Sequence, residues 1–374
     1  MKQPFLSRRR VVGAAAVMSA AAARGSAANS AVTVGLIGAG GRGTYDAGLL
    51  VKHTGARLVA LCDIFDEQIE RARAKIPAAD AKAYKRMDEL LASDVDAVII
   101  ATPVYLHPEH FEAAVKAGKH IYIEKPAGLD VEGCKRVMHA ADGADRKLNI
   151  AFGFQQRYGP GYRKGHKLVT SGAIGPLRVA HAHWIKGAVP ANNIPIARPA
   201  NEIQKIKDWH SWRDTYGDYI VETYCHGVDV LNWFLGGHPE SALGSASKTV
   251  IQRGDMRDHC TVTFTYKDSR QATLTGTQIT PRFYRDVHET FYCADGVVET
   301  AREYWRHHRG KGDVLEEREP MDITANGLQE FVQRIRDGKP ENTGVRSAES
   351  TLTAIMARTS MDLKREVTWA EIMK

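Results

Sequence analysis

The chain has 374 residues, of which 43% are apolar and 25% are charged, a composition that excludes a disordered or fibrous protein. Its length predicts about two domains, each long enough to bury a core. The formal net charge is +7, but five of the basic residues lie in residues 1–31, which contain no acid. Elsewhere the basic residues are interspersed with acids, so we predict no nucleic-acid partner.

Residues 1–28 predict a signal peptide. The arginines Arg8, Arg9 and Arg10 precede a weakly apolar, Ala-rich stretch, and small residues that suit a signal peptidase follow it. The stretch is too short to span a bilayer, which needs about 20 apolar residues. The pattern resembles a twin-arginine signal, although an ordinary secretory signal stays open. We therefore expect a protein that is exported, is periplasmic, and is free of the membrane once the signal is removed.

The five cysteines do not predict a disulfide framework. They are widely spaced, odd in number and contain no C-x-x-C pair. We expect most of them to be buried free thiols. They are Cys62, Cys134, Cys225, Cys260 and Cys293.

The first predicted strand, residues 31–37, is β-branched and ends in a glycine-rich turn, residues 38–43. A helix to about residue 52 and a second buried strand, residues 57–62, follow and complete a βαβ unit. The turn contains G-x-G-x-x-G, and an acid, Asp63, follows it by about 20 residues. This context predicts a dinucleotide-binding site.

Each glycine of the turn has its own expected role. Gly38 permits the tight turn, Gly40 lets the backbone approach the pyrophosphate, and Gly43 lets the helix pack on the strand. Asp63 is placed to bind the ribose 2′-hydroxyl, and its charge would repel a 2′-phosphate, which favours NAD. NADP stays open because Arg42 offers a cation. Gly41 completes the set of turn residues that we expect to contact the cofactor.

Alternating elements continue to about residue 153. The pattern predicts helices at 66–75, 87–92, 108–117 and 131–141, and strands at 97–101, 120–123 and 148–152. This order predicts an α/β Rossmann domain, residues 31–153, with a doubly wound parallel sheet. Ligands bind beyond the carboxyl ends of such strands, where Thr102 and Glu124 would lie.

Residues 154–374 follow a different pattern. A helix at 162–170, a strand at 177–185 and an irregular stretch at 187–208 precede four alternating strand candidates. Helices are predicted at 326–337 and 347–364. We expect an α+β domain with a mostly antiparallel sheet that serves substrate binding and oligomerisation. The four strand candidates are residues 241–251, 260–266, 271–278 and 287–293.

Three motifs of the chain form a recognisable set. The first is the glycine turn. The second is Ala101-Thr102-Pro103 with His107, followed by Ala117-Gly-Lys-His120 and by Glu124-Lys125-Pro126. The third is Glu222-Thr-Tyr-Cys-His226-Gly-Val-Asp229, which continues to Asn232-Trp-Phe-Leu-Gly236. Together they resemble the motifs of the glucose–fructose oxidoreductase, inositol dehydrogenase and MocA family (Gfo/Idh/MocA) over the whole mature length.

The resemblance implies that Lys125 and His226 flank the reacting carbon. It also adds Pro103, His107 and Lys125 to the expected cofactor contacts, beside Thr102 and Glu124. The sequence departs from the family's D-x-x-x-H pattern because Glu222 replaces the aspartate. The carboxylate is retained with one more methylene, so Glu222 is a third expected catalytic residue, as a partner of the substrate or of His226. If residues 222–226 are helical, the i,i+4 spacing places both side chains on one face.

These residue types suit hydride transfer. A base must remove the hydroxyl proton as the carbonyl forms, and a histidine such as His226 titrates in the useful range. Lys125 would stabilise developing negative charge on the oxygen and would lower its own pKa if desolvated. Arg157, Asp229 and Tyr224 are weaker candidates for substrate contact.

The resemblance implies an oxidoreductase that moves hydride between a tightly bound nicotinamide cofactor and a secondary hydroxyl or carbonyl of a sugar or cyclitol. Export favours tight binding, because free cofactor should be scarce outside the cytoplasm. An alternative is an NAD-retaining glycosidase that acts by oxidation, elimination, water addition and re-reduction. A third possibility is a non-enzymatic binder, which intact Lys125 and His226 disfavour. The family also implies a homo-oligomer, a dimer or tetramer.

His181 and His183 alternate along one predicted strand and so share a face, an arrangement that could form part of a metal site. No third ligand follows at a diagnostic spacing. We therefore predict no metal site.

Overall fold

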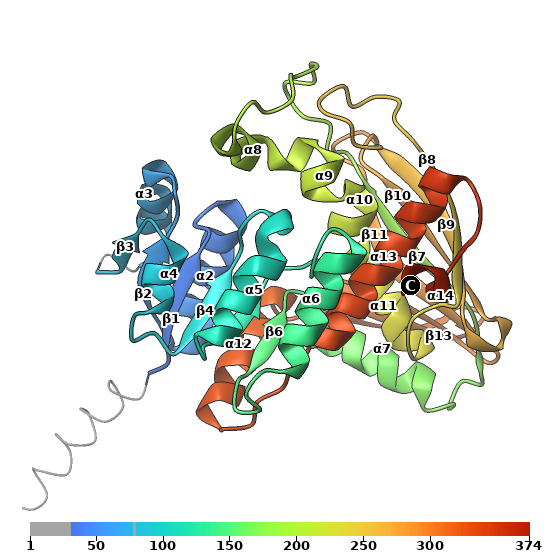
Figure 1. Ribbon diagram of the computed structural model, residues 1–374. Coiled ribbons are helices and arrows are strands. Elements are labelled where there is room, and N and C mark those ends of the chain that lie inside the picture. Colours follow the sequence, from blue (N-terminus) through green and yellow to red (C-terminus); the bar gives the residue numbers. More distant parts are fainter. Residues whose placement is uncertain (1–30, 78–79) are drawn as a thin grey trace, which may run out of the picture.

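The computed structural model describes residues 31–77 and 80–374. The predicted signal peptide, residues 1–28, lies outside the described residues, so export stays a prediction. The described chain forms two units, each built on one sheet, with helices between the two sheets (Figure 1). Among the described helices, none combines the length and the apolar character needed to cross a membrane.

The first sheet carries the predicted Rossmann domain. Its described strands all pair in parallel, in the order β3-β2-β1-β4-β5-β6. The order reverses between β1 and β4, the point at which such folds bind ligands. The strands are β1 (Thr33–Ile37), β2 (Arg57–Cys62), β3 (Lys82–Tyr84), β4 (Ala97–Ile100), β5 (His120–Ile123) and β6 (Ile150–Phe152).

Helices cover both faces of this sheet, so its central strands are buried and almost wholly apolar. One face packs against α2 and α3, and the other against α4, α5 and α6. The doubly wound fold predicted from the alternation is confirmed. The helices are α2 (Gly41–Thr54), α3 (Asp66–Lys75), α4 (Met87–Leu91), α5 (His107–Lys116) and α6 (Val131–Asp142).

The second sheet is mostly antiparallel, as predicted. Its order is β14-β13-β12-β11-β7-β10-β9-β8-β15, and in the described chain β7 and β10 form its parallel pair. The strands are β7 (Leu177–Lys186), β8 (Ser241–Ser247), β9 (His259–Thr265), β10 (Gln271–Thr277), β11 (Arg285–Cys293), β12 (Val297–Ala301), β13 (Tyr304–Gly310), β14 (Asp313–Arg318) and β15 (Val367–Thr368).

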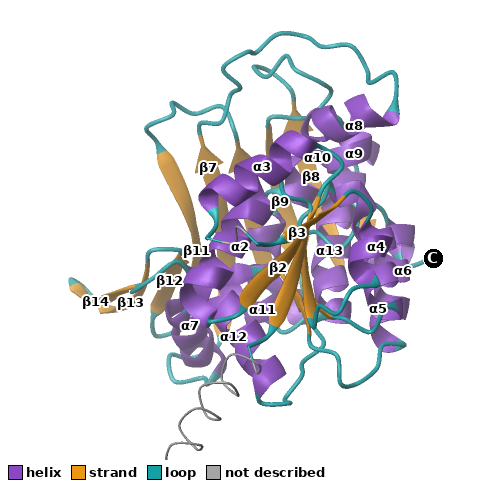
Figure 2. Cartoon of the chain, turned by 90° about the vertical axis from the view of Figure 1, so that its left-hand side faces the viewer, coloured by secondary structure: helices purple, strands orange, loops and turns teal. Residues whose placement is uncertain are grey.

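Helices cover one face of the second sheet and leave the other open (Figure 2). Inward residues of β7 such as Ala180 and Ala182 are buried, whereas the alternate residues are half-buried or exposed. The helices of this part are α7 (Pro160–Thr170), α8 (Glu202–Asp208), α9 (Arg213–Tyr216), α10 (Asp218–Glu222), α11 (Cys225–Leu235), α12 (Ile323–Arg336), α13 (Gly344–Leu363) and α14 (Trp369–Ile372).

Helix α12 packs against the first sheet, although it follows the strands β7 to β14 of the second sheet in the chain (Figure 1). Phe331 contacts Tyr122 of β5, with ring centroids 5.7 Å apart. The Asn149 side-chain amide donates to the Phe331 carbonyl, 3.1 Å away. Helix α13 then runs between the two units, where the Ala127 N–H donates to Thr351 Oγ1 at 3.0 Å. Both helices therefore fix one unit on the other.

Two sequence predictions differ from the structure in this region. The strand predicted for residues 241–251 ends at Ser247, because the N–H groups of residues 249–251 donate to the buried Asp258 carboxylate instead of to a strand. The stretch 187–208, predicted to be irregular, ends in the helix α8. The strands β12, β13 and β14 were not predicted, since charged residues interrupt their apolar alternation.

Candidate active site

The glycine turn between β1 and α2 forms an open cradle. Gly38 has a φ of +89°, and a Cβ on it would lie 2.7 Å from the Ala101 carbonyl carbon. A Cβ on Gly43 would lie 2.0 Å from the Gly38 carbonyl oxygen. In contrast, Gly40 and Gly41 face open space. The turn therefore combines a tight strand-to-helix contact with room for a pyrophosphate at the helix N-terminus.

Asp63 lies beside this cradle at the end of β2. Its Oδ2 accepts from the Ala39 N–H at 2.9 Å, and its Oδ1 accepts from the Phe65 N–H at 2.9 Å. Burial raises the pKa of Asp63, and these two N–H groups oppose the rise. A cavity of about 350 Å³ joins the glycine turn to Asp63, Thr102 and Pro103. These residues fit a dinucleotide.

Substituting Gly43 should disrupt the cradle. In Gly43→Ala the new methyl group collides with the Gly38 carbonyl, and overpacking of this kind costs about 1–3 kcal/mol, so NADH should bind about tenfold more weakly or worse. Gly48→Ala is the matched control, since Gly48 lies in the same helix and its Cβ would meet open space. Titration of NADH fluorescence measures both. Unchanged binding in Gly43→Ala would contradict this description of the turn.

A second cavity of about 350 Å³ adjoins the first and shares Arg42, Ala101, Thr102 and Trp209 with it. Lys125, Glu222 and His226 all line this second cavity. Lys125 follows β5, Glu222 ends α10, and His226 lies in the first turn of α11. The structure thus brings the three predicted catalytic residues together, next to the cofactor cradle.

Lys125 and Glu222 form a buried ion pair. Lys125 Nζ lies 2.6 Å from Glu222 Oε1 and donates to the Glu222 carbonyl at 2.7 Å. Burial opposes ionisation of Glu222, but Lys125 outweighs it, and the pKa of Glu222 falls to about 2. Burial also lowers the pKa of Lys125, yet Glu222 raises it further, and the net direction is upward. The pKa of Lys125 is therefore raised overall, where the sequence led us to expect a lowered one.

His226 is held by aromatic rings. Its imidazole stacks on Trp184, with centroids 5.3 Å apart and an interplanar angle of 9°, and meets Phe154 edge-on. Its buried Nδ1 has no hydrogen-bond partner among the described residues. Burial, and then the nearby cations, of which Lys125 acts most strongly, lower the pKa of His226 well below 6.5. The imidazole is therefore neutral at neutral pH and able to accept a proton.

Residues 222–226 do not form the single helix that would place Glu222 and His226 on one face. Helix α10 ends at Glu222, and α11 starts at Cys225. Glu222 pairs with Lys125, and its other carboxylate oxygen accepts from Thr223 Oγ1 at 2.7 Å. The carboxylate therefore holds the lysine.

Three predicted cofactor contacts, Arg42, His107 and Glu124, form hydrogen bonds or ion pairs with other residues of the protein. Arg42 Nη2 lies 2.8 Å from Glu124, and Arg42 Nε lies 3.2 Å from Asp46. His107 is fully buried, with ring nitrogens 2.7 Å from the Pro126 carbonyl oxygen and 3.0 Å from that of Thr102. His107 thus ties the loop after β4 to the loop that carries Lys125. Arg42 is paired with two carboxylates of the protein itself, which disfavours its use as the partner of a 2′-phosphate.

The structure does not bring Arg157, Asp229 or Tyr224 to the cavity, which corrects their assignment as substrate contacts. Arg157 forms a two-pronged ion pair with Asp229, at 2.8 Å for each bond. Asp229 is buried and also accepts from Ser350 at 2.7 Å. Tyr224 packs against Gly276, and its hydroxyl accepts from Gln278. These side chains tie core segments together.

Several cavity residues were not predicted, among them Trp184, Lys186, Tyr216 and Arg302. Trp184 and Lys186 lie on the inward face of β7, which is otherwise apolar. A lysine on such a face could have indicated a functional residue in the sequence. Burial, Arg285 and Lys125 lower the pKa of Lys186. Nothing in their local sequence distinguishes Tyr216 and Arg302 from surface residues.

Two family models match consecutive parts of the chain. Residues 32–152 match the NAD-binding Rossmann fold of the GFO/IDH/MocA oxidoreductase family, and residues 162–299 match the C-terminal domain of the same family. Together they cover more than half of the chain. The Rossmann match and the cradle beside Asp63 identify the cofactor as NAD.

Curated proteins resemble the chain over different lengths. An uncharacterized oxidoreductase of Synechocystis sp. is 26% identical over 82% of this chain and 75% of that protein. Inositol 2-dehydrogenase 3 of Saccharopolyspora erythraea is 32% identical over 56% of each chain. The match therefore spans little more than half the length of that dehydrogenase.

Solved structures share the fold over most of the chain. A putative myo-inositol dehydrogenase of Sinorhizobium meliloti has a TM-score of 0.70 and 23% identity, covering 90% of this chain and 99% of that one. Levoglucosan dehydrogenase, in complex with NADH and L-sorbose, has a TM-score of 0.78 and 15% identity, covering 92% and 100%. Through the matches of both its domains, the chain belongs to the GFO/IDH/MocA family of oxidoreductases.

Proposed function

We propose that the protein is an NAD-dependent dehydrogenase that exchanges hydride with a secondary hydroxyl or carbonyl of a cyclitol or sugar. The names of its relatives, inositol 2-dehydrogenase and levoglucosan dehydrogenase, support this substrate class. The observation that carries the proposal is the second cavity, where a buried lysine cation and a neutral histidine adjoin the dinucleotide cradle.

Each residue has a distinct role in the proposed reaction. NAD, when bound along the glycine turn, supplies the hydride acceptor. Lys125 stabilises negative charge on the substrate oxygen, and Glu222 holds Lys125 in place and keeps it charged. His226 accepts the hydroxyl proton during oxidation and returns it during reduction.

The neutral state of His226 suits this role. An imidazolium would be unfavourable among Lys125, Arg302 and Arg42, so the ring waits deprotonated in the oxidation direction. The flanking rings of Trp184 and Phe154 limit its rotation. Lys186 and Tyr216 line the same cavity and are candidate partners for the other hydroxyl groups of a polyol.

Purified protein tests the proposal. Denaturation followed by quantification of released nicotinamide shows whether NAD is retained, as the predicted export requires. A panel of inositols, aldoses and anhydrosugars, with and without added NAD, is then followed by NADH absorbance. Reduction of NAD by a cyclitol or sugar supports the proposal. Release of the aryl group from aryl glycosides without net NADH would contradict it and favour the redox-neutral glycosidase.

A further inference from the structure

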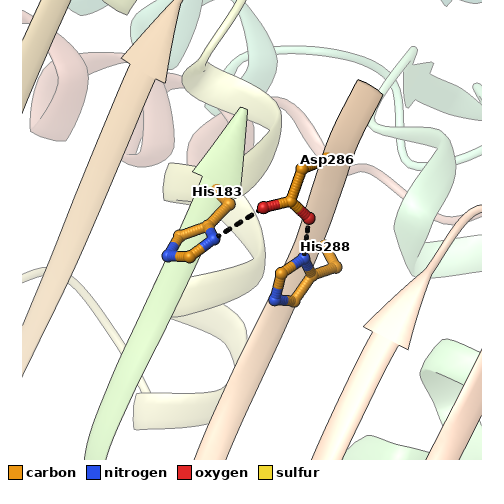
Figure 3. A group of neighbouring side chains, drawn as sticks. All are labelled: His183, Asp286 and His288. Carbon is orange, nitrogen blue, oxygen red and sulfur yellow. Dashed lines mark hydrogen bonds and ion pairs between the residues drawn. The ribbon is translucent and has the colours of Figure 1, made fainter. Parts of the chain in front are cut away.

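A second cluster of polar side chains, His183, Asp286 and His288, lies on the second sheet (Figure 3). His183 of β7 and His288 of β11 are directly paired in the antiparallel register. Asp286 lies two residues before His288 on the same strand and so on the same face. Trp184, the next residue of β7, faces inward and stacks on His226. The cluster and the active site therefore occupy opposite faces of one strand pair.

The three side chains point toward one another. Asp286 Oδ2 lies 3.2 Å from His183 Nδ1, and Asp286 Oδ1 lies 2.7 Å from His288 Nδ1. One ligand atom from each residue lies within 4.8 Å of the others. Tetrahedral zinc, with bonds of about 2.0–2.2 Å, holds its ligand atoms roughly 3.3 Å apart. Binding of an ion therefore requires side-chain rotations that bring the ligand atoms from within 4.8 Å to this spacing.

The local backbone preorganises the cluster. All three residues are on paired strands in the middle of the sheet, so their Cα positions are fixed by ladder hydrogen bonds. The Asp286 carboxylate also orients both imidazoles, because each turns its Nδ1 toward one of the two oxygens (Figure 3). An ion needs little further ordering of these groups, which lowers the cost of binding.

The cluster is also accessible. The side chains of His183, Asp286 and His288 are 33%, 29% and 21% exposed. An ion can enter from solvent, and its remaining coordination positions would face away from the sheet, toward water or a second copy of the chain. Two imidazoles and one carboxylate suit a divalent first-row transition metal and not Mg²⁺ or Ca²⁺, which prefer oxygen ligands.

We propose that His183, Asp286 and His288 form a binding site for a divalent first-row transition-metal ion, with Zn²⁺ as the probe. The proposal is independent of the proposed function. It also revises the expectation of no metal site, which followed from the lack of a third ligand near His181 and His183 in the sequence. The missing ligands lie on β11, a strand about 100 residues further on.

His181 provides a matched control. It lies on the same strand and the same face as His183, and its ring contacts Tyr292 at a centroid distance of 5.1 Å. It is not one of the three residues whose ligand atoms converge. A change at His181 therefore removes an imidazole from the same face and leaves the cluster intact.

Calorimetric titration of Zn²⁺ into chelator-treated, untagged full-length protein tests the site. We expect one saturable ion per chain for the wild type and for His181→Gln, and at least about tenfold weaker binding for His288→Gln and Asp286→Asn. Co²⁺ provides a second readout, since its visible spectrum should report nitrogen and oxygen ligation in the wild type and lose this signature in His288→Gln. NADH binding and thermal unfolding verify that each variant is folded.

Three results would overturn the proposal. The first is the absence of saturable Zn²⁺ binding to the wild type. The cluster would then be a carboxylate hydrogen-bonded to two imidazoles, without a metal-binding role. The second is equal Zn²⁺ affinity in the wild type and His288→Gln. The third is a Co²⁺ spectrum dominated by thiolate ligation, which would place the ion at a cysteine such as the half-buried Cys293.

Discussion

Lys125→Met should reduce turnover of the proposed substrates by about 10²- to 10³-fold, the usual cost of removing a group that stabilises charge on a reacting oxygen. The methionine keeps the length of the side chain and removes its charge. Binding of NAD should change little, because the glycine turn and Asp63 line the other cavity. Steady-state NADH formation gives kcat and KM, and fluorescence titration gives the affinity for NADH.

The expected result depends on the protein remaining folded. Lys125→Met leaves the buried carboxylate of Glu222 without its cation, which is destabilising. The double variant Lys125→Met/Glu222→Gln removes both charges, so it should recover thermal stability and still lack activity. Lys116→Met, at an exposed position on α5, is the control and should behave as the wild type. Near-normal turnover in the double variant would contradict the role of Lys125.

His226→Gln should lower the rate of oxidation by about 10²- to 10⁴-fold, since it removes the proposed proton acceptor. The pH profile provides a sharper test. Because the pKa of His226 is held well below 6.5, the base is deprotonated at and above neutral pH. The decrease of kcat/KM that reflects protonation of His226 should therefore occur below pH 6.5. This decrease should be missing in His226→Gln.

The control for His226→Gln is His139→Gln, at an exposed position on α6 that should change neither rate nor pH profile. NADH binding should persist in both variants and shows that the fold is intact. An acid limb centred near pH 6.5, the ordinary value for histidine, would contradict the buried, cation-surrounded environment of His226. An unchanged rate in His226→Gln would assign proton transfer to another group, for which Lys186 in the same cavity is a candidate.

The sequence by itself determined the features that depend on contiguous residues. A β-branched strand, a glycine turn and a helix follow each other directly, so the cofactor cradle and Asp63 could be predicted from spacing alone. The alternation of strands and helices predicted the parallel sheet for the same reason. The family motifs also marked Lys125, Glu222 and His226, and the structure brings all three to one cavity.

Only the tertiary structure decided what each buried polar group contacts. Periodicity shows which face of an element is buried but not which distant segment covers it. Glu222 therefore pairs with Lys125, 97 residues away, and Asp229 pairs with Arg157, 72 residues away, where the sequence left both acids as possible partners of substrate or His226. In the same way α12 packs on the first sheet, and β11 brings Asp286 and His288 beside His183, because pairing between strands far apart in the chain is set by the packing of the whole fold.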